Sequence, residues 1–262
     1  MRLRIIGCTG SMSGTTSPSS SYLVEADVVE NGVKRTYSLV MDLGSGAMGS
    51  LMKYIDPRNI DAIAFSHLHA DHCVDIVGMH VYRKWHPDGE LPQIPVYSPE
   101  DGKARVRGID GGNVEDEYDT FRFEHVEHGS VFHVGPMTVE CFDAWHTIPA
   151  LAFRITGPSE NGDEEVVLVY TGDTDLCDSE IDAARGADLL LCEAAFEDGR
   201  DEYRGVHMNG ERAGILAREA DVKRVVLTHI QPWTNSSVVV EHAKKQYAGP
   251  LECAVVDNLY SL

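Results

Sequence analysis

The chain has 262 residues, of which 43% are hydrophobic and 24% are charged, a composition typical of a globular protein with a substantial core. Its 42 acidic and 22 basic residues give a net charge of −20, which argues against a long RNA or DNA partner because such binding depends on lysine and arginine contacts to phosphates. The sequence contains no apolar run near the roughly 20 residues of a membrane span and no signal-peptide pattern, so we expect a cytoplasmic protein.

Short apolar runs recur along the chain and predict strands over Leu3–Ile6, Tyr22–Val24, Tyr37–Met41, Ala62–Phe65, Val96–Ser98, Met137–Phe142, Leu151–Ile155, Val166–Tyr170, Leu189–Cys192, Val225–Thr228 and Cys253–Val256. Helical periodicity predicts helices over Asp71–Arg83, Ser179–Arg185, Asn209–Ala220, with Asn209 as its N-cap, and Ser237–Tyr247. Many strands with interleaved helices indicate sheets covered by helices. Because no proline-rich linker or short repeat interrupts the chain, residues 1–262 are predicted to form a single domain.

The most informative stretch follows the fourth predicted strand, where His67, His69, Asp71 and His72 place four potential metal ligands within six residues. Alternation puts His67 and His69 on one side, which leaves Asp71 and His72 to face a second position. Imidazole and carboxylate ligands suit zinc, manganese or iron. The cluster therefore predicts a site with room for two metal ions, and a solvated histidine-rich loop is the alternative.

Three more candidates stand at the ends of predicted strands, namely His146, Asp173 and His229. Taken singly, each has an ordinary explanation as a packing histidine or a turn aspartate. Their shared position at strand ends, where loops carry function, makes them candidates for the remaining ligands. The six cysteines form no C-x-x-C pair and indicate reduced thiols, and Cys73 is expected to be a small buried residue rather than a ligand.

These residues, together with Asp42-Leu43-Gly44-Ser45-Gly46, resemble the motifs of the metallo-β-lactamase superfamily and follow its order over nearly the whole chain. The resemblance implies an α/β fold, a four-layered αββα sandwich of two mixed β-sheets flanked by helices. It implies two divalent ions, zinc first with manganese or iron as alternatives, and Asp42 as a residue that holds the ligand loop by hydrogen bonds. A homodimer is expected by analogy. The implied ligands are His67, His69 and His146 for one ion, Asp71, His72 and His229 for the other, and Asp173 as a bridge.

The second half of the chain resembles the ribonuclease Z branch of phosphodiesterases within this superfamily. Residues 189–196 are similar to the branch's His-Glu-Ala-Thr segment, and His207-Met208-Asn209 is similar to its His-Ser-Thr segment. The resemblance implies that Glu193 orients His207, which donates a proton to the leaving oxygen. A structural acid at a strand end and a histidine at a helix entry are the alternative interpretation. The catalytic residues that follow from this resemblance are Asp71, Asp173, Glu193 and His207.

Two departures from the branch argue against tRNA processing. Ribonuclease Z usually carries a protruding tRNA-binding arm between the positions of His146 and Asp173, but only 26 residues intervene here, and two strands with an Asn161-Gly162 turn use most of them. The branch's Arg-Asn pair in the amino-terminal loop is also missing, and residues 14–21 are mainly serine, threonine and glycine instead. A small phosphate remains compatible with such a loop, and so does a solvated turn.

We therefore predict a metal-dependent hydrolase of a small phosphodiester or nucleotide, with a cyclic nucleotide such as cyclic AMP as the preferred substrate. The chain resembles small actinobacterial proteins without the arm, some of which are regarded as cyclic-nucleotide phosphodiesterases. The alternatives are tRNA 3′ endonuclease activity, thioester or lactone hydrolysis, and a metal-stabilised protein without turnover. Glu193 and His207 have no obvious use in thioester or lactone hydrolysis.

Overall fold

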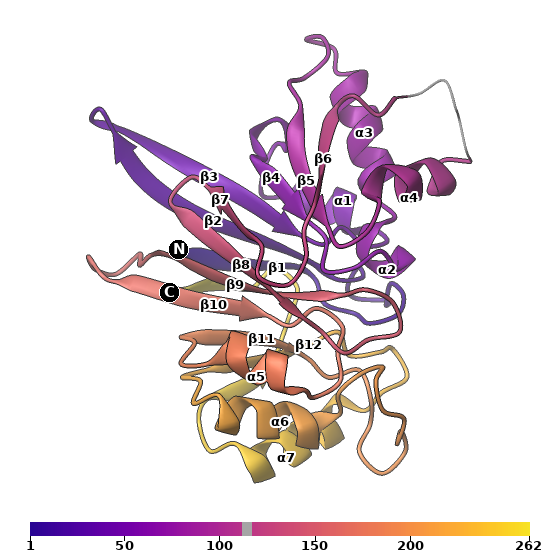
Figure 1. Ribbon diagram of the computed structural model, residues 1–262, viewed down its shortest axis with the longest axis vertical. Coiled ribbons are helices and arrows are strands. Elements are labelled where there is room, and N and C mark those ends of the chain that lie inside the picture. The colour runs from indigo at the N-terminus through magenta and orange to yellow at the C-terminus, as the bar shows by residue number, and fades with distance from the viewer. Residues whose placement is uncertain (112–116) are drawn as a thin grey trace.

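Two seven-stranded β-sheets pack face to face in the computed structural model, which describes residues 1–111 and 117–262 (Figure 1). The first sheet contains, in spatial order, β14 (Leu259–Ser261), β1 (Arg2–Gly7), β2 (Ser21–Glu30), β3 (Val33–Met41), β4 (Ala62–Ala64), β5 (Ile94–Ser98) and β6 (Phe121–His125). The second contains β13 (Leu251–Cys253), β12 (Val225–Thr228), β11 (Leu189–Glu193), β10 (Glu165–Tyr170), β9 (Leu151–Pro158), β8 (Met137–Asp143) and β7 (Val131–Val134). Both sheets are mixed, since β14 to β3 and β7 to β10 pair antiparallel and the other neighbours pair parallel.

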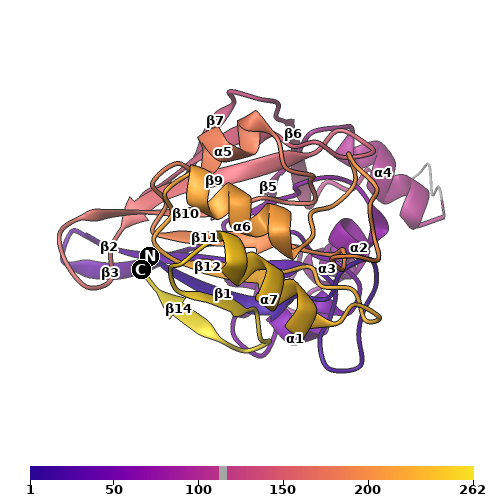
Figure 2. The ribbon, with the colours of Figure 1, turned by 90° about the horizontal axis from the view of Figure 1, so that it is seen from below.

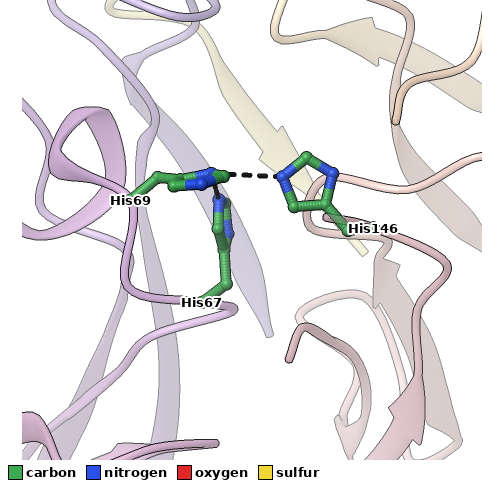
Figure 3. A group of neighbouring side chains, drawn as sticks. All are labelled: His67, His69 and His146. Atoms are coloured by element: carbon green, nitrogen blue, oxygen red, sulfur yellow. Dashed lines mark hydrogen bonds between the residues drawn. The ribbon is translucent and has the colours of Figure 1, made fainter. Parts of the chain in front are cut away.

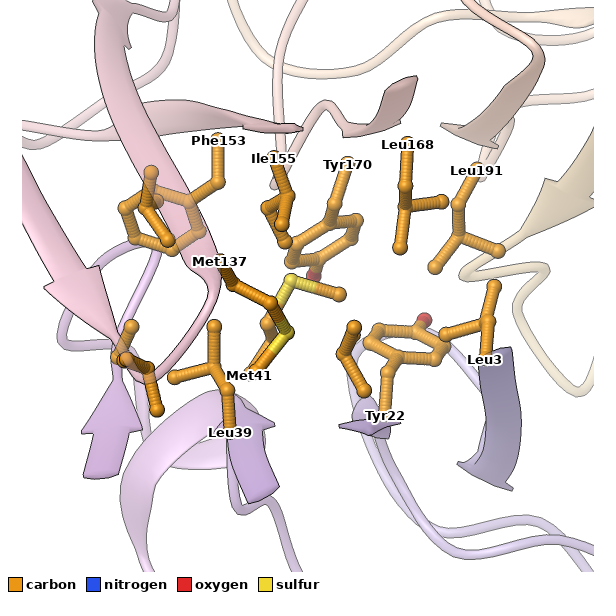
Figure 4. Packing of buried hydrophobic residues seen from close by; sticks show 14 of the residues in the cluster. Leu3, Tyr22, Leu39, Met41, Met137, Phe153, Ile155, Leu168, Tyr170 and Leu191 are labelled. Atoms are coloured by element: carbon orange, nitrogen blue, oxygen red, sulfur yellow. The ribbon is translucent and has the colours of Figure 1, made fainter. Parts of the chain in front are cut away.

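Strands of both sheets bury side chains on two faces. On β1, Ile5 faces the core between the sheets, whereas Ile6 packs under the helices of the first sheet. On β11, Leu191 faces the same central core, whereas Leu190 packs under the helices of the second sheet. Figure 4 shows the central core, to which both sheets contribute aliphatic and aromatic side chains. Double burial explains why these strands are continuous apolar runs in the sequence rather than alternating ones.

Helices cover the outer faces of both sheets and complete the four-layered αββα sandwich that the family resemblance implied (Figure 1), and Figure 2 shows α6 and α7 lying over the second sheet. The first sheet carries α1 (Ala47–Leu51), the 3₁₀ turn η1 (Pro57–Asn59), α2 (Ala70–Cys73), α3 (Ile76–Lys84) and α4 (Gly102–Ile109). The second carries α5 (Asp178–Ala184), α6 (Gly210–Glu219) and α7 (Ser236–Gln246). Among the described residues, none of the helices has the length and apolar character needed to cross a membrane.

The predicted helix Asp71–Arg83 was wrong in one respect, because the structure divides it into α2 and α3. The backbone of Leu43 causes the break: its N–H donates to the carbonyl of His72 at 2.6 Å, and its carbonyl accepts from the N–H of Asp75 at 3.1 Å. The carboxylate of Asp75 then accepts from the N–H of Met48 at 2.9 Å. These contacts with the loop after β3 replace the helical bonds and hold α2 against it.

Most other predicted elements overlap observed ones, and Asn209 caps α6 by accepting from the N–H of Arg212 at 3.0 Å. The predicted strand Cys253–Val256 was wrong: β13 ends at Cys253, and Val255 lies 56% exposed in the following turn. Sequence reasoning missed α1, α4, β6, β7 and β14. These elements are short or carry polar residues, so their apolar periodicity is weak.

Truncating a side chain between the sheets should strongly destabilise the fold. Leu39 is fully buried in the central core, and we expect Leu39→Ala to lower the free energy of unfolding by about 2–5 kcal/mol, because it removes apolar burial and leaves a cavity. Val33 lies 68% exposed on the same strand, and Val33→Ala should change the free energy of unfolding by less than about 0.5 kcal/mol. Urea unfolding monitored by circular dichroism measures both, and equal losses would contradict this account of the core.

Candidate metal centre

The seven predicted ligands come together from four segments at one edge of the sandwich. Each segment begins within three residues of the end of β4, β8, β10 or β12, so both sheets contribute. The ligand atoms of these seven residues form two neighbouring groups: His67, His69 and His146, and Asp71, His72, Asp173 and His229. His207 forms a third possible group with His146 and Asp173. Within each group, the ligand atoms lie within 4.8 Å of one another.

The first group consists of three imidazoles whose ring nitrogens converge (Figure 3). His69 Nδ1 lies 3.0 Å from His67 Nε2 and 3.1 Å from His146 Nε2. The opposite nitrogen of His146 lies 2.7 Å from the carbonyl of Val206, so that nitrogen carries the proton and the lone pair of Nε2 faces the other rings. Burial lowers the pKa of each of the three histidines, which favours the neutral form that binds metals.

The second group places Asp173 between both sets of ligands. One carboxylate oxygen of Asp173 lies 3.2 Å from His72 Nε2, and the other lies 3.2 Å from His229 Nε2 and 3.7 Å from His67 Nε2. Asp71 lies beside the same rings, 3.4 Å from His72 Nε2 and 3.9 Å from His229 Nε2. Asp173 therefore lies within 3.7 Å of rings from both ligand groups.

Three buried polar atoms of this group test whether a cation fits there. His72 Nε2, His229 Nε2 and one oxygen of Asp173 are buried without a hydrogen-bond partner. Such atoms are rare in folded proteins because each one costs desolvation energy. Although burial opposes it, Asp173 and Asp42 raise the pKa of His72, which indicates that the site favours positive charge. The donor set suits a divalent ion of the zinc, manganese or iron kind.

Asp42 holds the ligand segment in place from behind, as the sequence led us to expect. Its buried carboxylate accepts hydrogen bonds from the N–H of Ser66 at 2.7 Å, the hydroxyl of Ser66 at 2.8 Å and the hydroxyl of Tyr170 at 2.7 Å. It also lies 2.7 Å from His72 Nδ1, which leaves Nε2 of that ring to face the site. Asp42 adopts a left-handed backbone conformation with φ 56°, which aspartate and asparagine tolerate better than most residues.

Ser20, which was not identified from the sequence, orients the ring of His229 as Asp42 orients that of His72. Ser20 is fully buried, and its hydroxyl lies 2.8 Å from His229 Nδ1. His229 also has a left-handed backbone, and a Cβ atom at Gly10 would lie 2.1 Å from its carbonyl oxygen, so only glycine fits there. A serine-rich loop gives no local signal for such a contact, because the two residues are 209 positions apart.

Glu193 and His207 form a hydrogen-bonded pair beside both ligand groups. Glu193 is fully buried, and its carboxylate lies 2.8 Å from His207 Nδ1. The same carboxylate accepts from the backbone N–H groups of Thr174 and Ala195 at 3.0 Å and of Met208 at 3.3 Å.

The position and charge of His207 suit proton transfer. Its Nδ1 atom lies 3.8 Å from the carboxylate of Asp173. Burial alone would lower the pKa of His207, but the charge and hydrogen bond of Glu193 raise it to about 9. Glu193 therefore favours the protonated form of His207 beside the ligand cluster.

Cys73 is buried next to this cluster but does not belong to it. Its thiol points to backbone carbonyls, at 3.2 Å from that of His69 and 3.6 Å from that of Leu68. The thiol belongs to neither ligand group. Cys73 therefore acts as the small packing residue that the sequence predicted.

An αββα sandwich that gathers histidine and aspartate side chains at one sheet edge defines a class of metal-dependent hydrolases. Residues 43–230 match the family described as Beta-lactamase superfamily domain. The chain belongs to the metallo-β-lactamase superfamily and is a metal-dependent hydrolase of its ribonuclease Z-like branch.

Several known proteins resemble the chain over most of its length. It is 34% identical over 265 residues to the Mycobacterium tuberculosis protein Rv1339, covering 100% of this chain and 92% of that protein. It is 26% identical to the probable metallo-hydrolase YhfI of Bacillus subtilis, covering 97% of both, and the solved structure of YhfI superposes with a TM-score of 0.81 over 100% of this chain and 98% of that one. It is 28% identical to ribonuclease Z of Myxococcus xanthus, covering 82% of this chain and 85% of that enzyme.

Removing the charge of Asp42 should weaken metal binding without unfolding the protein. Asp42→Asn keeps the shape and tolerates the left-handed backbone, but its amide cannot accept all the hydrogen bonds of the carboxylate. We expect zinc affinity to fall about 10- to 100-fold, the usual cost of losing a residue that orients a ligand. Competition with a chromophoric chelator measures the zinc affinity. The control is Asp88→Asn, a change at an exposed position. Equal affinity in Asp42→Asn and the native protein would refute this role.

Proposed function

We propose that the chain is a phosphodiesterase that uses two divalent ions, zinc first, to cleave a small phosphodiester, with a cyclic nucleotide such as cyclic AMP as the preferred substrate. The single observation that carries this proposal is the Glu193–His207 pair beside the two ligand groups. The first ion would be held by His67, His69 and His146, the second by Asp71, His72 and His229, with Asp173 between them. A pair of this kind has a direct use in phosphodiester cleavage, where a leaving alkoxide must be protonated.

The residues divide the chemistry as follows. Two divalent ions held here would supply electrostatic stabilisation of the phosphoryl oxygens and lower the pKa of a water molecule toward about 7. Asp71 and Asp173 would orient that water by accepting its hydrogen bonds. Glu193 holds Nδ1 of His207, so the opposite nitrogen is the one that donates the proton to the leaving oxygen. Proton donation of this kind contributes about 10²- to 10⁴-fold to a rate.

The segment between His146 and Asp173 supports a small substrate. It forms the β9–β10 hairpin, whose strands pair closely and are joined by residues 159–164. The net charge of −20 also disfavours a long polyanion. The similarity to ribonuclease Z of Myxococcus xanthus keeps tRNA 3′ processing as the second candidate, and precursor tRNA therefore belongs among the substrates to be tested.

Substrate choice can be measured directly on protein of known metal content. We expect the zinc- or manganese-loaded protein to hydrolyse cyclic AMP and bis(p-nitrophenyl) phosphate, to lose both activities when a chelator removes the metal, and to regain them when metal is restored. Precursor tRNA should remain uncleaved in the same preparation. Failure with both phosphodiesters would refute the proposal, and salt-sensitive cleavage of precursor tRNA would favour the second candidate.

Replacing His207 should separate proton transfer from metal binding. We expect His207→Ala to lower kcat for cyclic AMP about 10²- to 10⁴-fold with metal content unchanged, because the leaving oxygen loses its proton donor. His133 lies on β7, remote in the fold from the ligand segments, and His133→Ala serves as the control. Steady-state kinetics and metal quantification check both variants. Full activity in His207→Ala would exclude it as the proton donor, and a thioesterase or lactonase would be indifferent to the change.

A further inference from the structure

A cavity of about 400 Å³ adjoins the first ligand group on the side of His69. Its volume falls within the range of about 300–1,000 Å³ that is typical of sites for small organic ligands. It is open to solvent and is bordered by three parts of the chain: the ligand segment after β4, the segment that leads from β5 into α4, and the loop that follows His146. The residues that line it are Leu68, His69, Glu100, Asp101, Arg105 and Ile148.

The apolar walls of the cavity come from the same segments as the metal ligands. Leu68 stands between His67 and His69, and Ile148 stands two residues after His146. A molecule between these two side chains would therefore lie next to the first ligand group. The cavity is placed to receive the part of a substrate that extends away from the reacting phosphate.

Arg105 supplies an unpaired cation to this cavity. It lies in α4, and its Nε atom is buried without a hydrogen-bond partner. Among the residues that the structure describes, no carboxylate forms an ion pair with its guanidinium, although Arg2, Arg58, Arg200, Arg204 and Arg212 all have such partners. Its side chain interacts with the thiol of Cys73, whose pKa is raised to about 11 by burial, so this neighbour does not neutralise the guanidinium. The buried Nε–H of Arg105 therefore has no acceptor within the described part of the chain and is free to donate to a ligand.

The other polar residues of the cavity decide which acceptor fits. Glu100 and Asp101 line the cavity together with Arg105, so its polar lining combines two acidic residues with one basic residue. Asp101 uses one oxygen to cap α4 by accepting from the N–H of Ala104 at 2.9 Å. A second phosphate would meet like charges here, whereas a neutral ring with both donor and acceptor atoms would find a partner for each. Apolar walls suit the faces of such a ring.

We propose that this cavity binds the nucleobase of the substrate, with Arg105 donating hydrogen bonds to its acceptor atoms and the neighbouring carboxylates accepting from its amino group. An arginine can donate to a ring nitrogen of adenine such as N7, while a carboxylate accepts from the adjacent N6 amino group. The inference rests on the proposed function, which it deepens by naming the nucleoside part as the group that is recognised. Arg105 is then a specificity residue, and it takes no part in the cleavage step.

Binding of 5′-AMP and inorganic phosphate to the zinc-loaded protein tests this inference by isothermal titration calorimetry. We expect the native protein to bind 5′-AMP at least about tenfold more tightly than phosphate. Arg105→Met should weaken the binding of 5′-AMP about 10- to 100-fold, which is the range for losing hydrogen bonds to a charged group. The affinity for phosphate should stay unchanged. Lys103→Met removes a cation from the same helix outside the cavity and should alter neither affinity.

A second variant guards against a folding defect in the first. Ile148→Trp fills the cavity from the opposite wall and should cause the same selective loss of 5′-AMP binding. Equal affinities of the native protein for 5′-AMP and phosphate would overturn the proposal, as would equal losses of both ligands in Arg105→Met. Because binding is measured, the result does not depend on turnover: selective binding by Arg105 without hydrolysis of any phosphodiester would refute the proposed function and leave the base-binding cavity standing.

Discussion

The fold gathers buried imidazoles and carboxylates at one edge of the sandwich. The desolvation cost of burying these polar groups must be offset by hydrogen bonds or by a bound cation. An unpartnered buried polar group costs about 1–3 kcal/mol, and His72, His229 and Asp173 each bury such an atom. A bound cation removes this cost, while the atoms on the far side of the rings are already satisfied by Asp42 and Ser20. The surrounding structure therefore orients the rings of His72 and His229 toward the site.

The mixed topology of the sheets creates this edge. Both sheets combine an antiparallel part with a parallel part, and the ligand segments follow strands of both. Asp42 follows β3 of the first sheet and accepts a hydrogen bond from Tyr170 of the second, so packing of the sheets and placement of the ligands are coupled. The site exists only when the two sheets are packed together, which links the central core to function.

If the proposed roles hold, substrate recognition and chemistry are divided between the two sides of the ligand cluster. Glu193 and His207 come from the second sheet and the chain that follows it, whereas Arg105 comes from a helix of the first sheet. The groups that would act on the leaving oxygen and the groups that would select the substrate are thus carried by different layers. One layer can change its side chains without disturbing the other, which is compatible with different substrates among relatives of the same fold.

The sequence by itself determined most of the strands, since double burial produces apolar runs, and it singled out the seven candidate ligand residues, because four of them lie within one short motif and the rest stand at strand ends. Tertiary structure decided what local patterns do not encode. Hydrogen bonds from Leu43 split the predicted helix, and the packing of distant segments brought Ser20 to His229 and opened the cavity beside Arg105. Periodicity reports which face of an element is buried, whereas these contacts depend on which remote segment lies against that face.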